Sequence, residues 1–177
     1  YVVEEAALSL RNYIEGKGIN LIIDPEIEEK IIEADPNEIE RCIVNIVSNA
    51  AKFTSSGGNI RVDIKELNDW VKIEITDDGI GIPIGIQGMI FERFVQGDKS
   101  LTRLNEGSGI GLSIVKSIAE LHDGKIELIS DGIKGSEFIV WLPNVKLNYT
   151  EESNNLVDYI TDDKNIELEL SDIYEVH

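Results

Sequence analysis

The sequence is poor in cysteine and in long apolar runs. Cys42 is the one cysteine among 177 residues, so no disulfide framework can form within the chain, and an intracellular protein is favoured. No apolar stretch approaches the roughly 18 residues that a membrane-spanning helix needs, and no signal peptide is recognisable at the start. We therefore expect this segment to be cytoplasmic and to make no direct membrane contact. A longer parent protein could still be anchored in the membrane by other segments.

Basic residues are also scarce. Sixteen Lys and Arg face thirty-four Asp and Glu, which gives a formal net charge of -18. A nucleic-acid partner is excluded, because such binders carry a basic surface. If the chain binds an anion such as a nucleotide, the site must supply its own local positive field. The hydrophobic content of 42% is normal for a globular protein, and the length suits one domain.

Hydrophobic periodicity predicts helices and strands in a mixed order. Asp35 and Pro36 are typical of a helix N-cap and first helical position, and Asn68-Asp69 joins two alternating runs into a hairpin. The predicted helices cover residues 1–16, 36–53 and 112–122, and the predicted strands cover residues 19–24, 30–34, 59–67, 70–76, 125–130 and 136–143. This order predicts an α/β (α+β) fold in which a mixed, mostly antiparallel sheet carries helices on one face.

The helix over residues 36–53 carries an unusual polar row. Asn45, Asn49 and Lys52 stand at i, i+4 and i+7, so they stack along one face. Asparagine is a mediocre helix former, because its amide competes for backbone hydrogen bonds. The row is either an ordinary solvated face or a set of amide oxygens and an ammonium group that holds a metal and phosphate. The helix alone leaves both interpretations open.

The segment DDGIGIP, residues 77–83, follows an alternating strand. Asp77 continues the inward-facing parity of that strand, where a bare carboxylate is costly without a donor. It is either a turn or capping aspartate, or an acceptor for a ligand amino group such as the exocyclic amine of adenine. Gly79 and Gly81 favour the second interpretation, because glycine lets the backbone approach a ligand closely.

The segment EGSGIGLSIV, residues 106–115, is a glycine-rich loop that leads directly into a helix. Gly107, Gly109 and Gly111 leave backbone amides accessible, and a helix N-terminus favours negative charge, so the segment suits phosphate. It lacks the lysine of a P-loop and the spacing of a dinucleotide fingerprint. A flexible hinge is the alternative.

Between these two segments lies a long connection, which in a compact domain is usually functional. Phe91 and Phe94 stand three apart on a short helical turn and are expected to dock the connection onto the body of the domain. Lys99 and Arg103 either meet phosphates or are solvated. Further on, the acidic residues 144–177 predict a solvated tail, or an edge or partner-binding strip at residues 166–170.

Four segments together resemble the motifs of one family. NIVSNAAKFT resembles the N box, DDGIGIP the first glycine box, IFERF the F box, and GSGIGLSIVKSIAELHDGKI the second glycine box with its following helix and strand. KGSEFIVWLP looks like the last sheet motif. Their order resembles the ATP-binding domain of sensor histidine kinases, in the gyrase, chaperone, histidine kinase and MutL superfamily, from about Ile19 to Pro143.

The resemblance implies a two-layer, Bergerat-type sandwich that binds ATP and Mg²⁺. By the family pattern, Asn49 coordinates Mg²⁺, Asn45 and Lys52 contact the phosphates, Asp77 holds the adenine amine, and Ser136 lies on the adenine side. Asn45, Asn49 and Lys52 form the implied catalytic group. The implied ATP contacts are Asn45, Asn49, Lys52, Phe53, Asp77, Gly79, Gly81, Ile82, Phe94, Lys99, Arg103, Gly107, Ser108, Gly109, Ile110, Gly111, Leu112 and Ser136.

The resemblance also implies a domain plan and partners. Residues 1–16 link to an upstream dimerisation domain with the phosphoaccepting histidine, residues 17–143 bind ATP with a lid at about 84–107, and residues 144–177 form an acidic extension. The γ-phosphate would pass to that histidine and then to a response regulator, in a parent expected to be a homodimer. His122 is not expected to be the acceptor.

The lid departs from the family pattern. Ile84 and Ile86 replace acidic or polar residues, and Val95 and Gln96 replace an aromatic residue and an arginine. These changes put lid closure and turnover in question, though not nucleotide binding. Three rival functions stay open: an anti-sigma-type serine kinase, an ATP-gated clamp, and a partner-binding module without turnover. Asn45 stands where clamps carry a catalytic acid, which argues against the clamp.

Overall fold

The computed structural model describes residues 1–27, 31–93 and 110–144. In these ranges a five-stranded sheet has the order β1-β2-β3-β5-β4. β1 (Asn20–Pro25) pairs in parallel with β2 (Asn59–Leu67). β3 (Trp70–Asp77), β5 (Ser136–Pro143) and β4 (Lys125–Ile129) continue the sheet through antiparallel pairings. The predicted mixed, mostly antiparallel sheet is confirmed.

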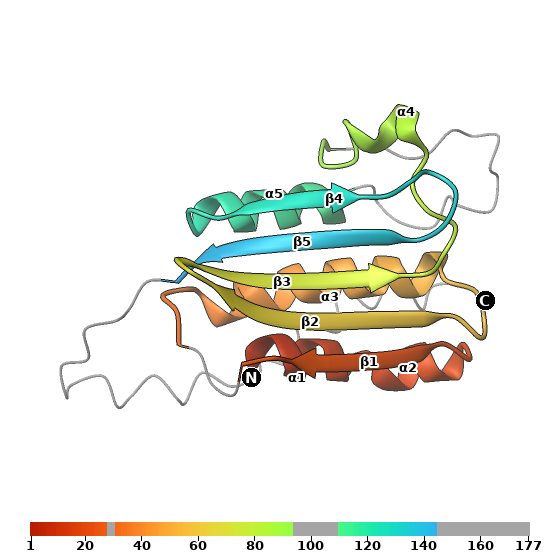
Figure 1. Cartoon of the computed structure of the whole chain (residues 1–177), viewed down its shortest axis with the longest axis horizontal. Helices are drawn as coiled ribbons and strands as arrows, with labels where there is room; N and C mark the ends of the chain where they lie inside the picture. The colour runs from red at the N-terminus through yellow and green to blue at the C-terminus, as the bar shows by residue number, and fades with distance from the viewer. Residues whose placement is uncertain (28–30, 94–109, 145–177) are drawn as a thin grey trace.

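Helices cover one face of this sheet (Figure 1). They are α1 (Val2–Ser9), α2 (Arg11–Gly16), α3 (Pro36–Phe53) and α5 (Gly111–Leu121), while α4 (Ile84–Gln87) is a single short turn in the connection after β3. Within the described ranges, none of the helices has the length and apolar character to span a bilayer. The predicted two-layer sandwich with helices on one face is confirmed.

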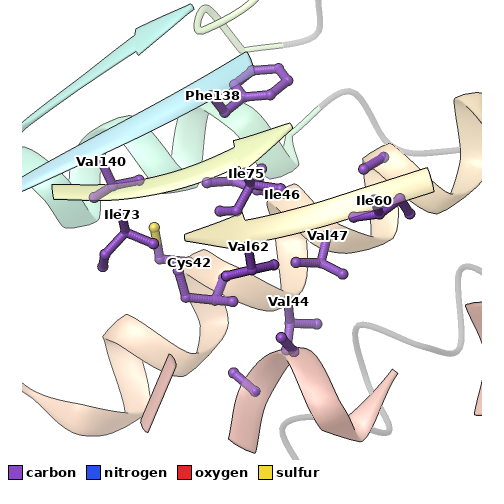
Figure 2. Packing of buried hydrophobic residues seen from close by; sticks show 14 of the residues in the cluster. Cys42, Val44, Ile46, Val47, Ile60, Val62, Ile73, Ile75, Phe138 and Val140 are labelled. Carbon is purple, nitrogen blue, oxygen red and sulfur yellow. The ribbon is translucent and has the colours of Figure 1, made fainter. Parts of the chain in front are cut away.

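The core lies between α3 and the central strands (Figure 2). Ile46 and Val47 of α3 pack with Val62, Ile73 and Ile75, all of them at most 1% exposed. Burial of one such side chain contributes about 1.5–3 kcal/mol. The cluster therefore fixes the rotation and register of α3 against the sheet, and with them the polar residues that α3 carries.

The start of α3 is capped as predicted. The Asp35 side chain accepts hydrogen bonds from the amides of Asn37 and Glu38, at 2.9 and 3.4 Å, and Pro36 opens the helix. The ring of His122 at the end of α5 accepts a hydrogen bond from the Asp35 amide through Nε2, at 3.0 Å. His122 thus joins two helices, which is a structural role and agrees with its exclusion as a phosphoacceptor.

Cys42 lies in the α3 core and is 1% exposed. Burial, aided by the charge of Glu38, raises the pKa of its thiol to about 12. Because the thiolate is the reactive form, we expect folded protein to resist maleimide at neutral pH and to react quickly only after denaturation. Mass spectrometry over time, with and without denaturant, measures this. Labelling of folded protein at the rate of an unstructured cysteine peptide would contradict the burial of this thiol.

One sequence prediction of secondary structure needs refinement and one is wrong. Residues 1–16 are helical as predicted, but the helix is interrupted at the fully buried Leu10, whose amide donates to the Ala7 carbonyl at 3.3 Å. Residues 31–34 form no strand: Ile32 packs on the core without a strand partner, and Ile31 is 55% exposed. Residues 28–30 are outside the described residues.

Candidate nucleotide-binding site

Asp77 lies at the end of β3, directly opposite Ser136 at the start of β5. Its side chain is buried, with 6% exposed. One carboxylate oxygen accepts a hydrogen bond from the Ser136 hydroxyl at 2.8 Å, and the other accepts one from the Gly79 amide at 2.9 Å. The inward orientation predicted from strand parity is therefore confirmed, and two predicted site residues, Ser136 and Gly79, contact it.

The surroundings of Asp77 disfavour its charge. Burial raises the pKa of this carboxyl group; the Ser136 hydroxyl and the Gly79 amide oppose the rise, and the neighbouring Asp78 adds to it. An aspartate that only stabilises a turn would accept the hydrogen bond from the Gly79 amide, but its carboxylate would not have to be buried. Carboxyl groups whose pKa is displaced by burial cluster at functional sites, which favours the ligand-binding interpretation.

The first glycine segment crosses the C-terminal end of α3. The Ile80 amide donates to the Phe53 carbonyl at 3.3 Å. A Cβ atom on Gly79 would lie 2.4 Å from that same carbonyl oxygen, and 2.8 Å from a carboxylate oxygen of Asp77. Glycine is thus required here by a close backbone approach. Lys52 lies over the Phe53 ring, with Nζ 5.7 Å from its centroid, so the end of α3 borders the Asp77 site.

The start of α5 packs against Asn45. This side chain is 5% exposed, and its Nδ2 donates to the Arg41 carbonyl at 2.9 Å. A Cβ atom on Gly111 would lie 2.3 Å from Asn45 Oδ1. The solvated-face interpretation is therefore wrong for Asn45, because α5 covers it. The arrangement places an amide oxygen beside the N-terminus of an 11-residue helix, whose partial positive charge favours anions.

Asn49 and Lys52 continue from Asn45 toward the C-terminal end of α3, and both side chains are half-buried. Leu112 in the first turn of α5 is also half-buried. The row on α3 thus runs from the start of α5 at Asn45 to the border of the Asp77 site at Lys52. One end of the row thus lies at the start of α5 and the other at the Asp77 site. An extended ligand bound along the row could contact both.

A sequence-family model agrees with this geometry. The model of the histidine kinase-, DNA gyrase B- and HSP90-like ATPases matches residues 34–146. The chain belongs to this ATPase family. The match includes α3, the Asp77 segment, the start of α5 and all of β5. Family membership supports ATP as the nucleotide that the domain binds.

Relatives of this ATPase domain are histidine kinases. The circadian input-output histidine kinase CikA of Synechococcus elongatus is 34% identical over 142 residues, which cover 79% of this chain and 19% of CikA. The chain thus spans about a fifth of the length of that curated relative. The probable sensor kinase SilS of Salmonella typhimurium is 39% identical over 116 residues, covering 66% of this chain and 23% of SilS.

Solved structures share the fold. The nucleotide-free catalytic domain of histidine kinase ThkA has a TM-score of 0.71 and 25% identity, over 82% of this chain and 93% of that domain. ThkA in complex with the response regulator protein TrrA matches with a TM-score of 0.67 and 23% identity, over 81% of this chain and 40% of the matched chain. At that identity the second match shows the fold alone.

The predicted metal role depends on a single amide oxygen, that of Asn49. Among the described residues no group of three or more His, Cys, Asp and Glu side chains is placed to hold a metal. Mg²⁺ at phosphate-transfer sites usually takes one or two protein oxygens, together with water and substrate phosphates. The half-buried amide of Asn49 is a suitable single protein ligand, so the predicted Mg²⁺ role requires no metal cage in the protein.

Other predicted residues border the turn between β4 and β5 or are outside the described residues. A Cβ atom on Gly81, whose φ is 72°, would lie 3.0 Å from the Lys134 amide nitrogen, and the Ile82 amide donates to Ser130. Phe91 packs edge-on against Phe138 with ring centroids 6.4 Å apart, which confirms the docking prediction for this residue. The predicted residues outside the described ranges are Phe94, Lys99, Arg103, Gly107, Ser108 and Gly109.

Sequence reasoning also missed residues at the border of the site. Asp78 accepts hydrogen bonds from the amide and side chain of Asn59, both at 2.9 Å, and these bonds lower the pKa of its carboxyl group. Two adjacent aspartates, Asp77 and Asp78, are visible in the sequence, but strand parity predicts a role for Asp77 alone. Ser130 and Gln87, which bond to the glycine segment, belong to no recognised motif.

Proposed function

We propose that this chain is the ATP-binding catalytic domain of a two-component sensor histidine kinase. The observation that carries the proposal is the buried Asp77 carboxylate, bonded to Ser136 and Gly79 at the end of the sheet. Family membership and the kinase relatives support it. The domain plan is part of the proposal: a linker at 1–16, the ATP-binding domain at 17–143 with a lid at about 84–107, and an acidic extension at 144–177.

In this proposal the residues divide into two subsites. Asp77 accepts a hydrogen bond from the adenine amine, with Ser136 and Gly79 fixing the carboxylate. The row on α3 and the start of α5 face the phosphates, where Asn45 and Lys52 contact oxygens and Asn49 ligates Mg²⁺ as predicted from the resemblance. The remaining implied contacts, including those beyond the described residues, stay part of the proposal. When bound, Mg²⁺ neutralises charge that develops on the transferred phosphoryl group.

The acceptor is a histidine on an upstream dimerisation domain of the same, homodimeric parent, and a response regulator receives the phosphoryl group next. A kinase domain of this type uses cytoplasmic ATP. Positioning is the main contribution of the protein, since a neutral imidazole is already a nucleophile near neutral pH. ThkA, whose catalytic domain is 25% identical to this chain, has also been solved in complex with a response regulator protein, and this motivates the choice of partner. His122 is unsuited as an acceptor, because both its ring nitrogens contact main-chain atoms.

Phosphorylation of the parent kinase with γ-labelled ATP tests this function. We expect the label on a histidine, where it is stable in base and lost in acid, and no labelling in an Asp77→Asn variant. The response regulator should remove the label. Acid-stable label on serine would contradict the histidine kinase assignment and support the anti-sigma-type serine kinase instead.

A further inference from the structure

Two segments meet just beyond the Asp77–Ser136 pair. One is the glycine segment from Gly79 to α4, and the other is the turn of residues 130–135 between β4 and β5. The Gly135 amide donates to the Gly79 carbonyl at 2.8 Å. The Ser130 hydroxyl accepts from the Ile82 amide at 3.0 Å and donates to the Gly135 carbonyl at 2.8 Å. Ser130 therefore bonds to both segments with one hydroxyl group.

Gln87 completes the connection from α4. Its side-chain amide nitrogen donates to the Ile82 carbonyl at 2.6 Å and to the Ser130 carbonyl at 3.1 Å. Both backbone groups of Ile82 are thereby bonded to side chains, its amide to Ser130 and its carbonyl to Gln87. These bonds define a polar clamp made by Ser130 and Gln87.

Apolar packing holds these two segments only in part. Ile82 and Ile86 are half-buried against the core, whereas Ile80 is 49% exposed, Ile84 is 75% exposed and Ile133 is 81% exposed. Because the exposed isoleucines bury little surface, hydrogen bonds contribute to fixing the two segments relative to each other.

We propose that Ser130 and Gln87 are positioning residues that hold the adenine side of the nucleotide site in its binding conformation. The inference rests on the proposed function. Asp77 and Ser136 form the last paired position of the β3–β5 ladder at this end. Gly79 follows Asp77 by two residues and Gly135 directly precedes Ser136, so the Gly135–Gly79 bond continues the ladder past the carboxylate, and the clamp lies next to that bond. Such pre-organisation lowers the cost of ordering the site on binding.

Serine variants test the hydroxyl. We expect Ser130→Ala to weaken binding of a non-hydrolysable ATP analogue about tenfold, because one or two partly buried hydrogen bonds are lost, and Ser130→Thr to restore binding. Calorimetry measures the affinity, and thermal unfolding checks the fold. Ser117→Ala is the matched control, because the Ser117 hydroxyl bonds only within α5, to the Ser113 carbonyl; it should bind like wild type.

A glutamine variant supplies a pH readout that a general loss of packing would not give. In Gln87→Glu the carboxylate has no donor and faces two carbonyl oxygens, whereas its protonated form regains one donor. The affinity of Gln87→Glu relative to wild type should therefore rise as the pH falls from 8 toward the range in which a glutamate carboxyl group takes up its proton, about 4.3 when unperturbed. Gln87→Met, which cannot titrate, should stay uniformly weak relative to wild type.

The outcomes separate this inference from the proposed function. The clamp acts on the base side, so Ser130→Ala should weaken binding of ADP and of the ATP analogue by the same factor. If wild type binds and Ser130→Ala binds equally well, or if Gln87→Glu shows the pH profile of Gln87→Met, the clamp is overturned and the proposed function stands. If folded wild type binds no adenine nucleotide, both are overturned.

Discussion

The Asp77→Asn variant is expected to bind an ATP analogue about 100-fold more weakly than wild type. The carboxylate is a charged acceptor aimed at the adenine amine, and a hydrogen bond to a charged group is worth about 1.5–3 kcal/mol. An asparagine amide also presents a donor where the ligand presents another donor. Calorimetric titration of both proteins at pH 7.5 measures the difference, with the Ser117→Ala variant as a control that should bind normally.

The same substitution is expected to leave the nucleotide-free domain as stable as wild type, or more stable. Burial raises the pKa of Asp77, so its stabilising contribution is complete below the unfolded-state pKa and is lost as the pH rises through the folded-state pKa. Above the folded-state pKa the wild type carries a buried charge that the Asp77→Asn variant lacks.

Thermal unfolding of both proteins across the acidic to neutral range tests this sign. The difference in melting temperature, variant minus wild type, should grow as the pH rises and shrink as Asp77 takes up a proton. A variant that melts well below wild type at every pH would mean that Asp77 is a structural turn residue. Lost binding together with retained stability is the signature of a binding residue.

The Gly111→Ala variant is expected to weaken binding of the ATP analogue tenfold or more while melting near the wild-type temperature. A Cβ atom at this position would lie 2.3 Å from Asn45 Oδ1, so the Asn45 side chain must move. A flexible side chain moves at small cost, and alanine favours a helix over glycine by about 1 kcal/mol. The fold therefore tolerates the change, whereas the amide oxygen leaves the start of α5.

Gly16→Ala is the matched control for this change. Gly16 also lies in a helix, at the end of α2, and a Cβ atom there would meet nothing within 4 Å. Calorimetry on both variants should show a loss for Gly111→Ala alone. Equal, wild-type affinity in both would remove Asn45 from the phosphate side of the site, and equal loss in both would point to a general effect of glycine replacement.

Much of the sheet and half of the site were predictable because their determinants are local. Strand alternation placed Asp77 inward, because side chains alternate strictly between the two faces of a strand. The hairpin at Asn68-Asp69 and the Asp35 cap likewise depend on neighbours in sequence. In these places local chemistry and tertiary structure agree.

The errors come from contacts between distant residues. Asn45 belongs to a polar row, but its burial depends on α5, whose position the α3 sequence does not specify. Residues 31–34 have strand-like composition but no neighbouring strand to pair with. In the clamp, the Ser130 hydroxyl bonds to the Ile82 amide, 48 residues away, and the Gln87 side chain bonds to the Ser130 carbonyl, 43 residues away. Side-chain bonds to a distant backbone leave no periodic signal in the sequence.

The central claim is that this domain binds ATP together with Mg²⁺ through the Asp77 site. The most direct test is calorimetric titration of the 177-residue chain with a non-hydrolysable ATP analogue, with Mg²⁺ present and then with Mg²⁺ removed by a chelator. We predict one nucleotide per chain, bound more tightly with Mg²⁺. A folded chain that binds no nucleotide under either condition would contradict the claim and would favour a partner-binding module that has kept the ATPase fold without its ligand.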